Sequence, residues 1–414
     1  MLNVAIVGLG NWGRKLVTSV QGTSERIRFV RAVVRNPEPL HEYAAKTGIE
    51  LTTDFAATLA DPAIQAIVLA TPHTLHAEQI IAVAAAGKPV YCEKPLTLKR
   101  ADAIRAVEAC AKAGVLLAVG HDKRFWPSMQ ALTRIVQSGE LGEILHIEGH
   151  NSNETSRTSF ASWRASPEES PGGGMTGTGI HMVDAFVGLI GPVKRVQSLL
   201  MSRRPPPDVL DTVSVLFEFA NGVSGTMSSI RATPLYWRAH VFGNLGSAEA
   251  IGPTELVLRK TGGAAPVRMN FDPADALRGE LEAFAIAAGG GVPYPITPAQ
   301  MIQAGRRGEA FVLPSKSRPG TALWCLRVAA ATGTSRRTRN RLRLFVGSGT
   351  EVLTGHRKGQ AQRRQDVLAQ GFVPMFLLLK RVTLRKRLDV AGVRSRVPGW
   401  FARNAMAELR GIKS

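Results

Sequence analysis

Three glycines near the start of the chain, Gly8, Gly10 and Gly13, have the spacing of a backbone site for a diphosphate. The first permits a tight turn, the second leaves room for a pyrophosphate to approach the backbone, and the third lets a helix pack close to a strand. The N–H groups and the dipole at the start of that helix would hold the anion. The alternative is a glycine-rich turn that binds no ligand. The motif therefore predicts a dinucleotide site, with Asn11 and Trp12 as further contacts.

The elements that must position this turn are visible around it. The apolar run at 4–7 is typical of a strand buried on both faces, and an amphipathic helix is expected over 14–20. Further apolar runs alternate with helical patterns, which favours a parallel, doubly wound sheet. Ligands of such sheets bind beyond the carboxyl ends of the strands. The expected strands are 28–34, 65–70, 89–92 and 115–119, and the expected helices are 77–86 and 99–113.

The end of the second expected strand distinguishes between the two nicotinamide dinucleotides. An acidic residue there bonds the ribose 2′-hydroxyl of NAD, whereas an arginine suits the 2′-phosphate of NADP. No Asp or Glu occurs between Arg26 and Pro37, and Arg35 follows the strand. The sequence therefore favours NADP, with Arg35 as the phosphate partner. The alternative is a solvated loop cation in a protein that accepts both dinucleotides.

Several motifs together resemble the glucose–fructose oxidoreductase / inositol dehydrogenase / MocA family. The resemblance covers residues 1–303, and the Glu-Lys-Pro element after an Ala-Gly-Lys helix end is its most specific part. The matching pieces are GLGNWG at 8–13, TPHTLH at 71–76, AGKPVYCEKPL at 86–96, GHDKRF at 120–125, GGG at 172–174 and HMVD at 181–184.

The resemblance implies a fold, an activity and residue roles. The fold would be α/β, with an N-terminal Rossmann domain followed by an α/β domain built on a large open, mostly antiparallel sheet. The activity would be NAD(P)-dependent oxidation or reduction of a sugar, a polyol or a related small molecule. The open sheet face would pair with another subunit in a homo-oligomer. Lys94 would lie at the nicotinamide and the substrate, and His181 would be the acid/base residue.

One position departs from the pattern of the family. Many members carry an aspartate four residues before the histidine, and this chain has Gly177 there. Either His181 and Lys94 suffice for the chemistry, or this member uses its pocket differently. The missing carboxylate keeps an alternative function open, namely a dinucleotide-binding regulator or scaffold without catalysis.

The chemistry of the two residues fits the implied reaction. Hydride transfer from a secondary alcohol to a nicotinamide needs a base for the released proton and a positive group near the developing oxyanion. Histidine titrates near neutral pH, so His181 can give or take that proton, with Lys94 as the second partner. The structural alternatives are a surface lysine and a helix-start histidine bonded to the backbone. Asp184, one helical turn after His181, could orient it, contact substrate or be structural.

Other candidate site residues follow strand ends or lie in a long polar segment. Arg124, just beyond a strand end, and Asp184 are expected as substrate contacts. Trp163 and Arg164 are further candidates, because the segment 151–170 that contains them could roof a pocket. His73 and His76 have an H-x-x-H spacing, but no further ligand lies close by, so a metal site is not expected there and His76 is expected to line the cofactor cleft. No metal site is expected, and the expected cofactor contacts are Gly8, Gly10, Asn11, Trp12, Gly13, Arg35, Thr71, Pro72, His76, Glu93 and Lys94.

The chain is expected to contain three regions. Residues 1–122 form the Rossmann domain, 123–303 the substrate and oligomerisation domain, and 304–414 an atypical basic tail. In the second region, strand patterns without intervening helices favour an antiparallel sheet, with a hairpin turn at Asn221-Gly222. The expected strands there are 145–151, 195–201, 210–219, 223–230 and 236–243, and helices are expected at 180–189 and at 274–288, the second returning towards the first domain.

The positive charge of the 414-residue chain is concentrated in its tail. The net charge is +20, but residues 1–303 carry +1 and residues 304–414 carry +19. We interpret the arginine-rich tail as translation outside the ancestral reading frame from near Ala304, which would leave it poorly structured. The alternative is a genuine basic arm that binds nucleic acid or anionic lipid.

The composition excludes several classes of protein. With 44% hydrophobic and 20% charged residues, the chain can bury a sizeable core and is not wholly disordered. The apolar run at 372–379 is far shorter than the roughly 20 residues of a membrane span. The first strand lacks the basic residues of a signal peptide, and the three cysteines form no Cys-x-x-Cys pair. A reducing, cytoplasmic setting is expected, with a small-molecule substrate and no membrane or nucleic-acid partner.

Overall fold

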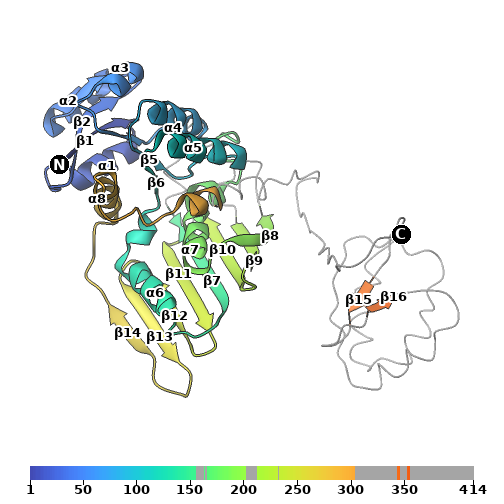
Figure 1. Cartoon of the computed structure of the whole chain (residues 1–414). Coiled ribbons are helices and arrows are strands. Elements are labelled where there is room, and N and C mark those ends of the chain that lie inside the picture. The colour runs from blue at the N-terminus through green and yellow to red at the C-terminus, as the bar shows by residue number, and fades with distance from the viewer. Residues whose placement is uncertain are drawn as a thin grey trace, which may run out of the picture. The chain divides into compact units, whose positions relative to one another are not determined.

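The chain divides into two units, Met1–Ala322 and Leu323–Ser414, in the computed structural model. In the second unit the described part is an antiparallel pair of short strands, β15 (Arg343–Phe345) and β16 (Val352–Thr354). The remaining expectations for the tail lie outside the described residues. The structure describes residues 1–154, 163, 166–201, 212–231 and 233–303, and the backbone of the two short strands (Figure 1).

Six parallel strands form the first sheet, in the order β3-β2-β1-β4-β5-β6. The order reverses between β1 and β4, and ligands of doubly wound sheets bind at such a switch point. Every residue of β4 is buried, as expected for a strand covered on both faces. The doubly wound prediction is confirmed. The strands are β1 (Leu2–Val7), β2 (Ile27–Val33), β3 (Glu50–Thr52), β4 (Ala66–Leu69), β5 (Val90–Glu93) and β6 (Leu117–Gly120).

Helices connect the strands of this sheet. In α1 the buried residues Gly13, Leu16, Val17 and Val20 recur at helical spacing, so one face packs on the sheet. In α3 the Asp54 carboxylate accepts a hydrogen bond from the Ala57 N–H at 2.8 Å and caps the helix start. The helices are α1 (Asn11–Val20), α2 (His41–Thr47), α3 (Phe55–Ala60), α4 (His76–Ala85) and α5 (Arg100–Ala113), with short 3₁₀ turns η1 (Glu38–Leu40), η2 (His73–Leu75) and η3 (Asp122–Phe125).

Eight strands form the second sheet, in the order β14-β13-β12-β11-β7-β10-β9-β8. Strands β7 and β10 pair in parallel and the other neighbours pair antiparallel, which confirms the mostly antiparallel sheet. Gly222 has a φ of +87° in the turn between β9 and β10, where the hairpin is predicted. The strands are β7 (Ile144–Asn153), β8 (Val193–Met201), β9 (Thr212–Phe219), β10 (Ser224–Arg231), β11 (Tyr236–Gly243), β12 (Gly246–Ile251), β13 (Glu255–Lys260) and β14 (Val267–Asn270).

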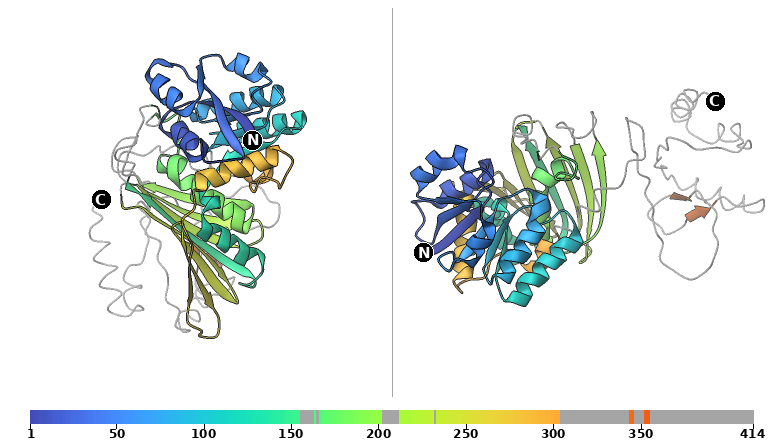
Figure 2. Two further views of the ribbon diagram at one scale, coloured as in Figure 1. Left: turned by 90° about the vertical axis from the view of Figure 1, so that its left-hand side faces the viewer. Right: turned by 90° about the horizontal axis from the view of Figure 1, so that it is seen from above.

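Two helices cover one face of the second sheet. Helix α6 (Pro127–Gln137) packs on β12 and β13, and α7 (Ile180–Ile190) packs on β7. The core between them is apolar and aromatic, with the rings of Phe186 and Phe217 at 5.3 Å between centroids. Among the described residues no helix packs on the opposite face of this sheet, as both views of Figure 2 show.

Helix α8 (Ala276–Ala288) returns to the first domain, as predicted. The Asp275 side chain caps its first N–H groups. Leu281 and Phe284 belong to the core of the first sheet, and α8 lies beside α1 (Figures 1 and 2). Residues 298–303 are helical, and Met301 is buried in the same core. The segment after the second sheet therefore fastens that sheet to the Rossmann domain.

Two properties of the described residues bear on the expected setting. None of the helices in the described ranges is long and apolar enough to cross a membrane. Cys92 and Cys110 are buried and carry free thiols, whereas Cys325 lies outside the described residues.

Candidate active site

The backbone of the β1–α1 turn requires glycine at positions 8 and 13 and leaves open space beside Gly10. Gly8 has a φ of +94°, and a Cβ there would lie 2.6 Å from the carbonyl oxygen of Ala70. A Cβ on Gly13 would lie 2.1 Å from the carbonyl oxygen of Gly8. A Cβ on Gly10 would have no described heavy atom within 4 Å. The first and third glycines therefore serve packing, and the second keeps open the space in which the sequence predicts a pyrophosphate.

The start of α1 fits a dinucleotide diphosphate. Its N-cap residue is Gly10, no side chain caps its N–H groups, and its first turn contains no acidic residue. Asn11 accepts a hydrogen bond from the Arg14 guanidinium at 3.2 Å, and the Lys15 ammonium lies 5.3 Å from the centre of the Trp12 ring. Uncapped N–H groups at the positive end of a helix dipole bind phosphate. The residues of this turn are therefore suited to a nicotinamide dinucleotide.

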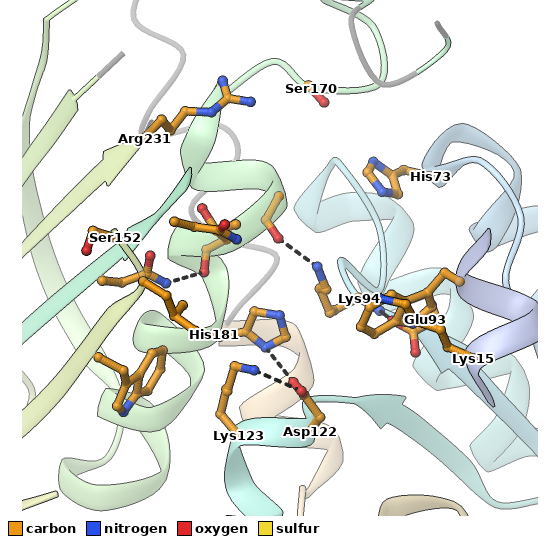
Figure 3. A pocket seen from close by; sticks show the side chains of 18 of the residues that line it. Lys15, His73, Glu93, Lys94, Asp122, Lys123, Ser152, Ser170, His181 and Arg231 are labelled. Atoms are coloured by element: carbon orange, nitrogen blue, oxygen red, sulfur yellow. Dashed lines mark hydrogen bonds and ion pairs between the residues drawn. The ribbon is translucent and has the colours of Figure 1, made fainter. Parts of the chain in front are cut away.

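A cavity of about 490 Å³ lies between the carboxyl edge of the first sheet and the second domain. Its walls come from α1, from the ends of β4 and β5, from the start of α7 and from β7, β10 and β11. Lys94, His181 and Glu93 line it (Figure 3). Trp12 and Thr71 belong to the same lining. Trp12, from the turn suited to a dinucleotide, and the two predicted catalytic side chains thus line one cavity, whereas Gly8, Gly10, Asn11 and Gly13 are not among the described residues of its wall.

Lys94 follows β5 directly and reaches the wall formed by the second domain. Its Nζ donates a hydrogen bond to the carbonyl oxygen of Gly177 at 2.6 Å (Figure 3). Gly177 belongs to a short π-helical turn, η6 (Met175–Gly179), that leads into α7. Single π-turns are frequent at functional sites because they shift backbone groups out of the α-helical pattern. Lys94 therefore bridges the two domains at the wall of the cavity.

Glu93 belongs to a buried polar cluster behind Lys94. Its Oε1 accepts from the Tyr91 hydroxyl at 3.4 Å, and its Oε2 accepts from the Lys94 N–H at 3.3 Å. Burial raises the pKa of Glu93 to about 7. Burial and the charge of Glu93 raise the pKa of Glu280, from α8, well above its ordinary value. A Cβ on Gly120 would lie 2.4 Å from the Tyr91 hydroxyl, so glycine there makes room for the cluster.

The buried Glu93 carboxyl makes the fold less stable as pH rises. The pKa of Glu93 is about 7 in the folded chain and near 4.5 when the side chain is exposed. The stabilisation of the folded state by the protonated carboxyl is therefore fully present below pH 4.5 and is lost as pH rises through 7. We expect Glu93→Gln to weaken this dependence, by on the order of 2–3 kcal/mol of unfolding free energy. Thermal melts between about pH 5 and about pH 8 measure it. The exposed Glu108→Gln is the control; equal pH slopes in all three proteins would contradict the assignment.

His181 is buried at the start of α7, beside Asp122 and Lys123. Its Nδ1 lies 3.4 Å from Asp122 Oδ1, and Lys123 Nζ lies 2.9 Å from Asp122 Oδ2 (Figure 3). Burial lowers the pKa of His181 well below its ordinary value, and the positive charges of Lys94 and Lys123 lower it further. The imidazole is therefore neutral at neutral pH and able to accept a proton.

Arg124 and Asp184, both predicted as substrate contacts, form a buried pair with each other. Arg124 Nε donates to Asp184 Oδ2 at 2.6 Å, and Nη2 donates to Oδ1 at 2.8 Å. Asp184 Oδ1 also lies 3.9 Å from His121 Nε2, and the His121 ring meets the His181 ring edge-on at 5.4 Å. Neither Arg124 nor Asp184 is among the described residues that line the cavity. The pair supports His121 and, through it, His181; a direct contact with substrate stays a prediction.

The turn after β4 carries Thr71, Pro72 and His76. Thr71 and His76 line the cavity, and the Thr71 hydroxyl donates to Gln79 at 2.6 Å. The buried His76 ring lies between two backbone carbonyl oxygens, with Nδ1 2.9 Å from Pro95 and Nε2 3.0 Å from Thr71. It thereby joins this turn to the Glu-Lys-Pro element. In the part of the chain that the structure describes, no three His, Cys, Asp or Glu side chains gather as metal ligands do.

Trp163, a predicted substrate contact, packs edge-on against His73 at 5.2 Å between ring centroids. His73 Nδ1 lies 2.7 Å from the Glu169 carbonyl oxygen, and the Glu169 carboxylate accepts from the Thr74 N–H at 3.2 Å. The segment before η6 is therefore anchored to the start of α4. Trp163 is not among the described residues of the cavity wall, and Arg164 lies outside the described residues.

Arg35 is exposed two residues beyond the end of β2. In the described ranges no side chain forms a hydrogen bond or ion pair with its guanidinium. Asn36, its neighbour, accepts a hydrogen bond from the Glu38 N–H at 3.3 Å. The guanidinium is therefore available at the strand end that meets the adenosine ribose in this fold.

Sequence reasoning missed Asp122, Lys123 and Asn151, all of which line the cavity. The signal for the first two was the GHDKRF motif at a strand end, in which only Arg124 was singled out. Asn151 lies in β7 and donates to the Thr178 carbonyl oxygen at 3.1 Å, and β11 places Trp237 opposite it. Such neighbours follow from long-range strand pairing, which no local motif encodes.

Comparison with known proteins assigns both described domains. The family model for the oxidoreductase family with an NAD-binding Rossmann fold matches residues 2–121, and the model for the GFO/IDH/MocA C-terminal domain matches residues 129–249. Inositol 2-dehydrogenase 2 of Saccharopolyspora erythraea is 30% identical over 306 residues, which are 70% of this chain and 86% of that protein. The chain belongs to the Gfo/Idh/MocA family.

Other Gfo/Idh/MocA relatives agree with this assignment. Levoglucosan dehydrogenase of Pseudarthrobacter phenanthrenivorans is 29% identical over 265 residues, covering 56% of this chain and 67% of that protein. A solved levoglucosan dehydrogenase in complex with NADH and levoglucosan has the same fold, with a TM-score of 0.68 over 75% of this chain and 96% of the other, at 24% identity. The resemblance found in the sequence is confirmed. As a Gfo/Idh/MocA member the chain is an NAD-binding oxidoreductase, an assignment favoured over the scaffold alternative.

Proposed function

We propose that this protein transfers a hydride between a nicotinamide dinucleotide and the CH–OH group of a sugar, a polyol or a related small molecule. One observation carries the proposal: Lys94 and His181 line a single cavity together with Trp12, which belongs to the turn suited to the dinucleotide. The relatives named inositol and levoglucosan dehydrogenases support the substrate class.

The chain's own residues would hold the dinucleotide in stated places. The N–H groups of α1 and the open space at Gly10 receive the diphosphate. Trp12, Thr71, His76 and Glu93 line the cavity together with Lys94. When bound, the nicotinamide supplies the carbon that accepts or gives the hydride.

Lys94 and His181 would act on the substrate oxygen. In the oxidising direction the neutral His181 takes the hydroxyl proton, since its imidazole is unprotonated at neutral pH. The Lys94 ammonium stabilises negative charge as it develops on that oxygen. In the reducing direction the same residues return the proton to the carbonyl oxygen. The Arg124–Asp184 pair keeps the second-domain wall in place, and we propose that Trp163 covers the substrate.

A substrate panel tests the proposal and separates it from the scaffold alternative. The purified chain is mixed with NAD⁺ or NADP⁺ and with inositols, hexoses or levoglucosan, and the absorbance of the reduced nicotinamide is followed. We expect turnover with at least one of these compounds. Tight dinucleotide binding without turnover on any of them, in either direction, would favour a non-catalytic role.

We propose a preference for NADP, with Arg35 as the contact for the 2′-phosphate. A charge-assisted hydrogen bond contributes about 1.5–3 kcal/mol, or roughly a 10- to 100-fold change in Kd. We therefore expect Arg35→Gln to weaken NADPH binding by that factor and to leave NADH binding within about twofold. Tryptophan quenching titrations measure both constants. The control Arg26→Gln removes an exposed arginine ahead of β2; an unchanged NADPH-to-NADH ratio in Arg35→Gln would contradict the preference.

We also propose a homo-oligomer formed through the face of the second sheet on which no described helix packs. That face carries ion pairs on neighbouring strands, including Arg238 with Glu148 and Arg259 with Glu249. Leu216, 53% exposed, lies on the same sheet. Light scattering of the full chain measures the assembly.

We further propose a reducing, cytoplasmic compartment, which the free thiols of Cys92 and Cys110 support.

A further inference from the structure

Two buried polar atoms face each other at the base of His181. Its Nδ1 and the Oδ1 of Asp122 are both closed off from solvent, and within the described residues neither makes a hydrogen bond of good geometry. They lie 3.4 Å apart (Figure 3). Buried polar atoms without partners cost free energy, so each is the natural partner of the other once the site tightens around a ligand.

Asp122 is held so that one of its oxygens stays directed at the histidine. Its Oδ2 bonds Lys123 Nζ at 2.9 Å, and the Lys123 ammonium lies 4.2 Å from the centre of the Trp126 ring. These contacts restrain the second oxygen of the carboxylate, the one that does not face His181 Nδ1. The residue lies in η3, directly beyond β6, so its backbone is fixed at the carboxyl edge of the first sheet.

Gly177 leaves the position one turn before His181 without a side chain. A Cβ there would meet no described heavy atom within 4 Å, so the space is open. The contribution of Gly177 to the site is its backbone: its carbonyl oxygen accepts a hydrogen bond from the Lys94 ammonium. Within the described residues, the carboxylate next to the His181 ring is therefore supplied by the other domain.

We propose that Asp122 is the positioning residue for His181, taking by way of η3 the part that a carboxylate at position 177 would play. Asp122 accepts the Nδ1–H of the neutral imidazole and leaves Nε2 as the nitrogen that meets the substrate hydroxyl. The inference rests on the proposed function. In the oxidising step the hydroxyl proton passes to Nε2 and the C–H hydride to the nicotinamide, which leaves a carbonyl. Asp122 keeps its hydrogen bond and takes no proton.

The charges around the ring give this pairing a measurable consequence. Lys94, Lys123 and the His121 ring disfavour the protonated imidazole, and the His121 ring is itself paired with Asp184. The Asp122 carboxylate is the facing group that favours it. Removing that negative charge would move the protonation of His181 to lower pH.

The test is Asp122→Asn in the full chain. We expect kcat to fall about 100-fold at an unchanged KM, and the acidic limb of the kcat/KM profile to move to lower pH. Asp102→Asn, which removes a partly exposed carboxylate paired with Arg105 in α5, is the matched control. We expect the double variant Asp122→Asn/Gly177→Asp to recover at least about tenfold, because residues four apart share a helix face.

A readout independent of turnover keeps the inference separate from the proposed function. NMR of the NADH-bound protein with labelled histidine nitrogens reports which ring nitrogen of His181 carries the proton; His181→Gln identifies its signals. We expect the Nδ1–H form in the unaltered chain and a mixture in Asp122→Asn. Activity of Asp122→Asn within twofold of the unaltered chain, or the same tautomer in both, would overturn the assignment of Asp122. Absence of turnover in the unaltered chain, with the Nδ1–H form present and lost on substitution, would overturn the proposed reaction alone.

Discussion

Lys94→Met is expected to lower turnover about 1,000-fold while NADH binding changes less than about threefold. Methionine keeps the length and the apolar stem of lysine but has no charge for the developing oxyanion and no donor for the Gly177 carbonyl oxygen. Because the proposed diphosphate contacts lie at the start of α1 and do not include Lys94, the ground-state affinity for the dinucleotide should be retained. Initial rates with the best compound of the panel, beside quenching titrations with NADH, measure the two effects.

The control for this variant is Lys99→Met. Lys99 is exposed just ahead of α5, five residues along the same segment, and the cavity wall in the described ranges does not include it. We expect its rate to stay within about twofold of the unaltered chain. If Lys94→Met retained more than about a tenth of the rate, Lys94 would not be the group that stabilises the oxyanion.

Alanine at Gly10 and at Gly13 should have different effects on the same turn. At Gly13 the added Cβ would lie 2.1 Å from the Gly8 carbonyl oxygen, so α1 must move off β1, at an expected cost of about 3 kcal/mol or more of unfolding free energy. At Gly10 the Cβ has open space, and the φ of −75° suits any residue. We therefore expect Gly10→Ala to fold normally and to weaken NADH binding about 10- to 100-fold, since the Cβ fills the space of the pyrophosphate.

Thermal melts and NADH titrations of the two variants separate packing from binding. Each serves as the control for the other, because both substitutions add one methyl group to the same turn. Unchanged NADH affinity in Gly10→Ala would show that the diphosphate does not lie over the start of α1. Unchanged stability in Gly13→Ala would show that the helix is not held against the turn.

The Rossmann domain could be predicted because its signals are local. The glycine spacing, the buried apolar runs and the helix ends all lie within a few residues of what they specify, and β4, β5 and β6 fall within two residues of the expected strands. Strands β12, β13 and β14 were not predicted. Their hairpins lack an Asn-Gly turn as clear as that at 221–222, and β14 has exposed residues on both faces.

The candidate site could be predicted only in part, for a related reason. Lys94 and His181 lie in motifs that stand out in the sequence, and both line the cavity. The pairing of Arg124 with Asp184 joins residues 60 positions apart and depends on how α7 packs against η3. The motifs place Arg124 and Asp184 near the site, but they do not show that the guanidinium of Arg124 pairs with the carboxylate of Asp184. The contact between Asp122 and His181 was missed for the same reason.

Isotope transfer measures the central claim, a hydride passing between substrate carbon and nicotinamide beside Lys94. Inositols, hexoses and levoglucosan deuterated at their CH–OH carbons are incubated with the purified chain and NAD⁺ or NADP⁺, and the reduced dinucleotide is analysed by mass spectrometry. The account predicts one deuterium atom per reduced nicotinamide with at least one compound, and none above background with Lys94→Met. Absence of deuterium from every reduced dinucleotide, with both dinucleotides bound, would contradict it.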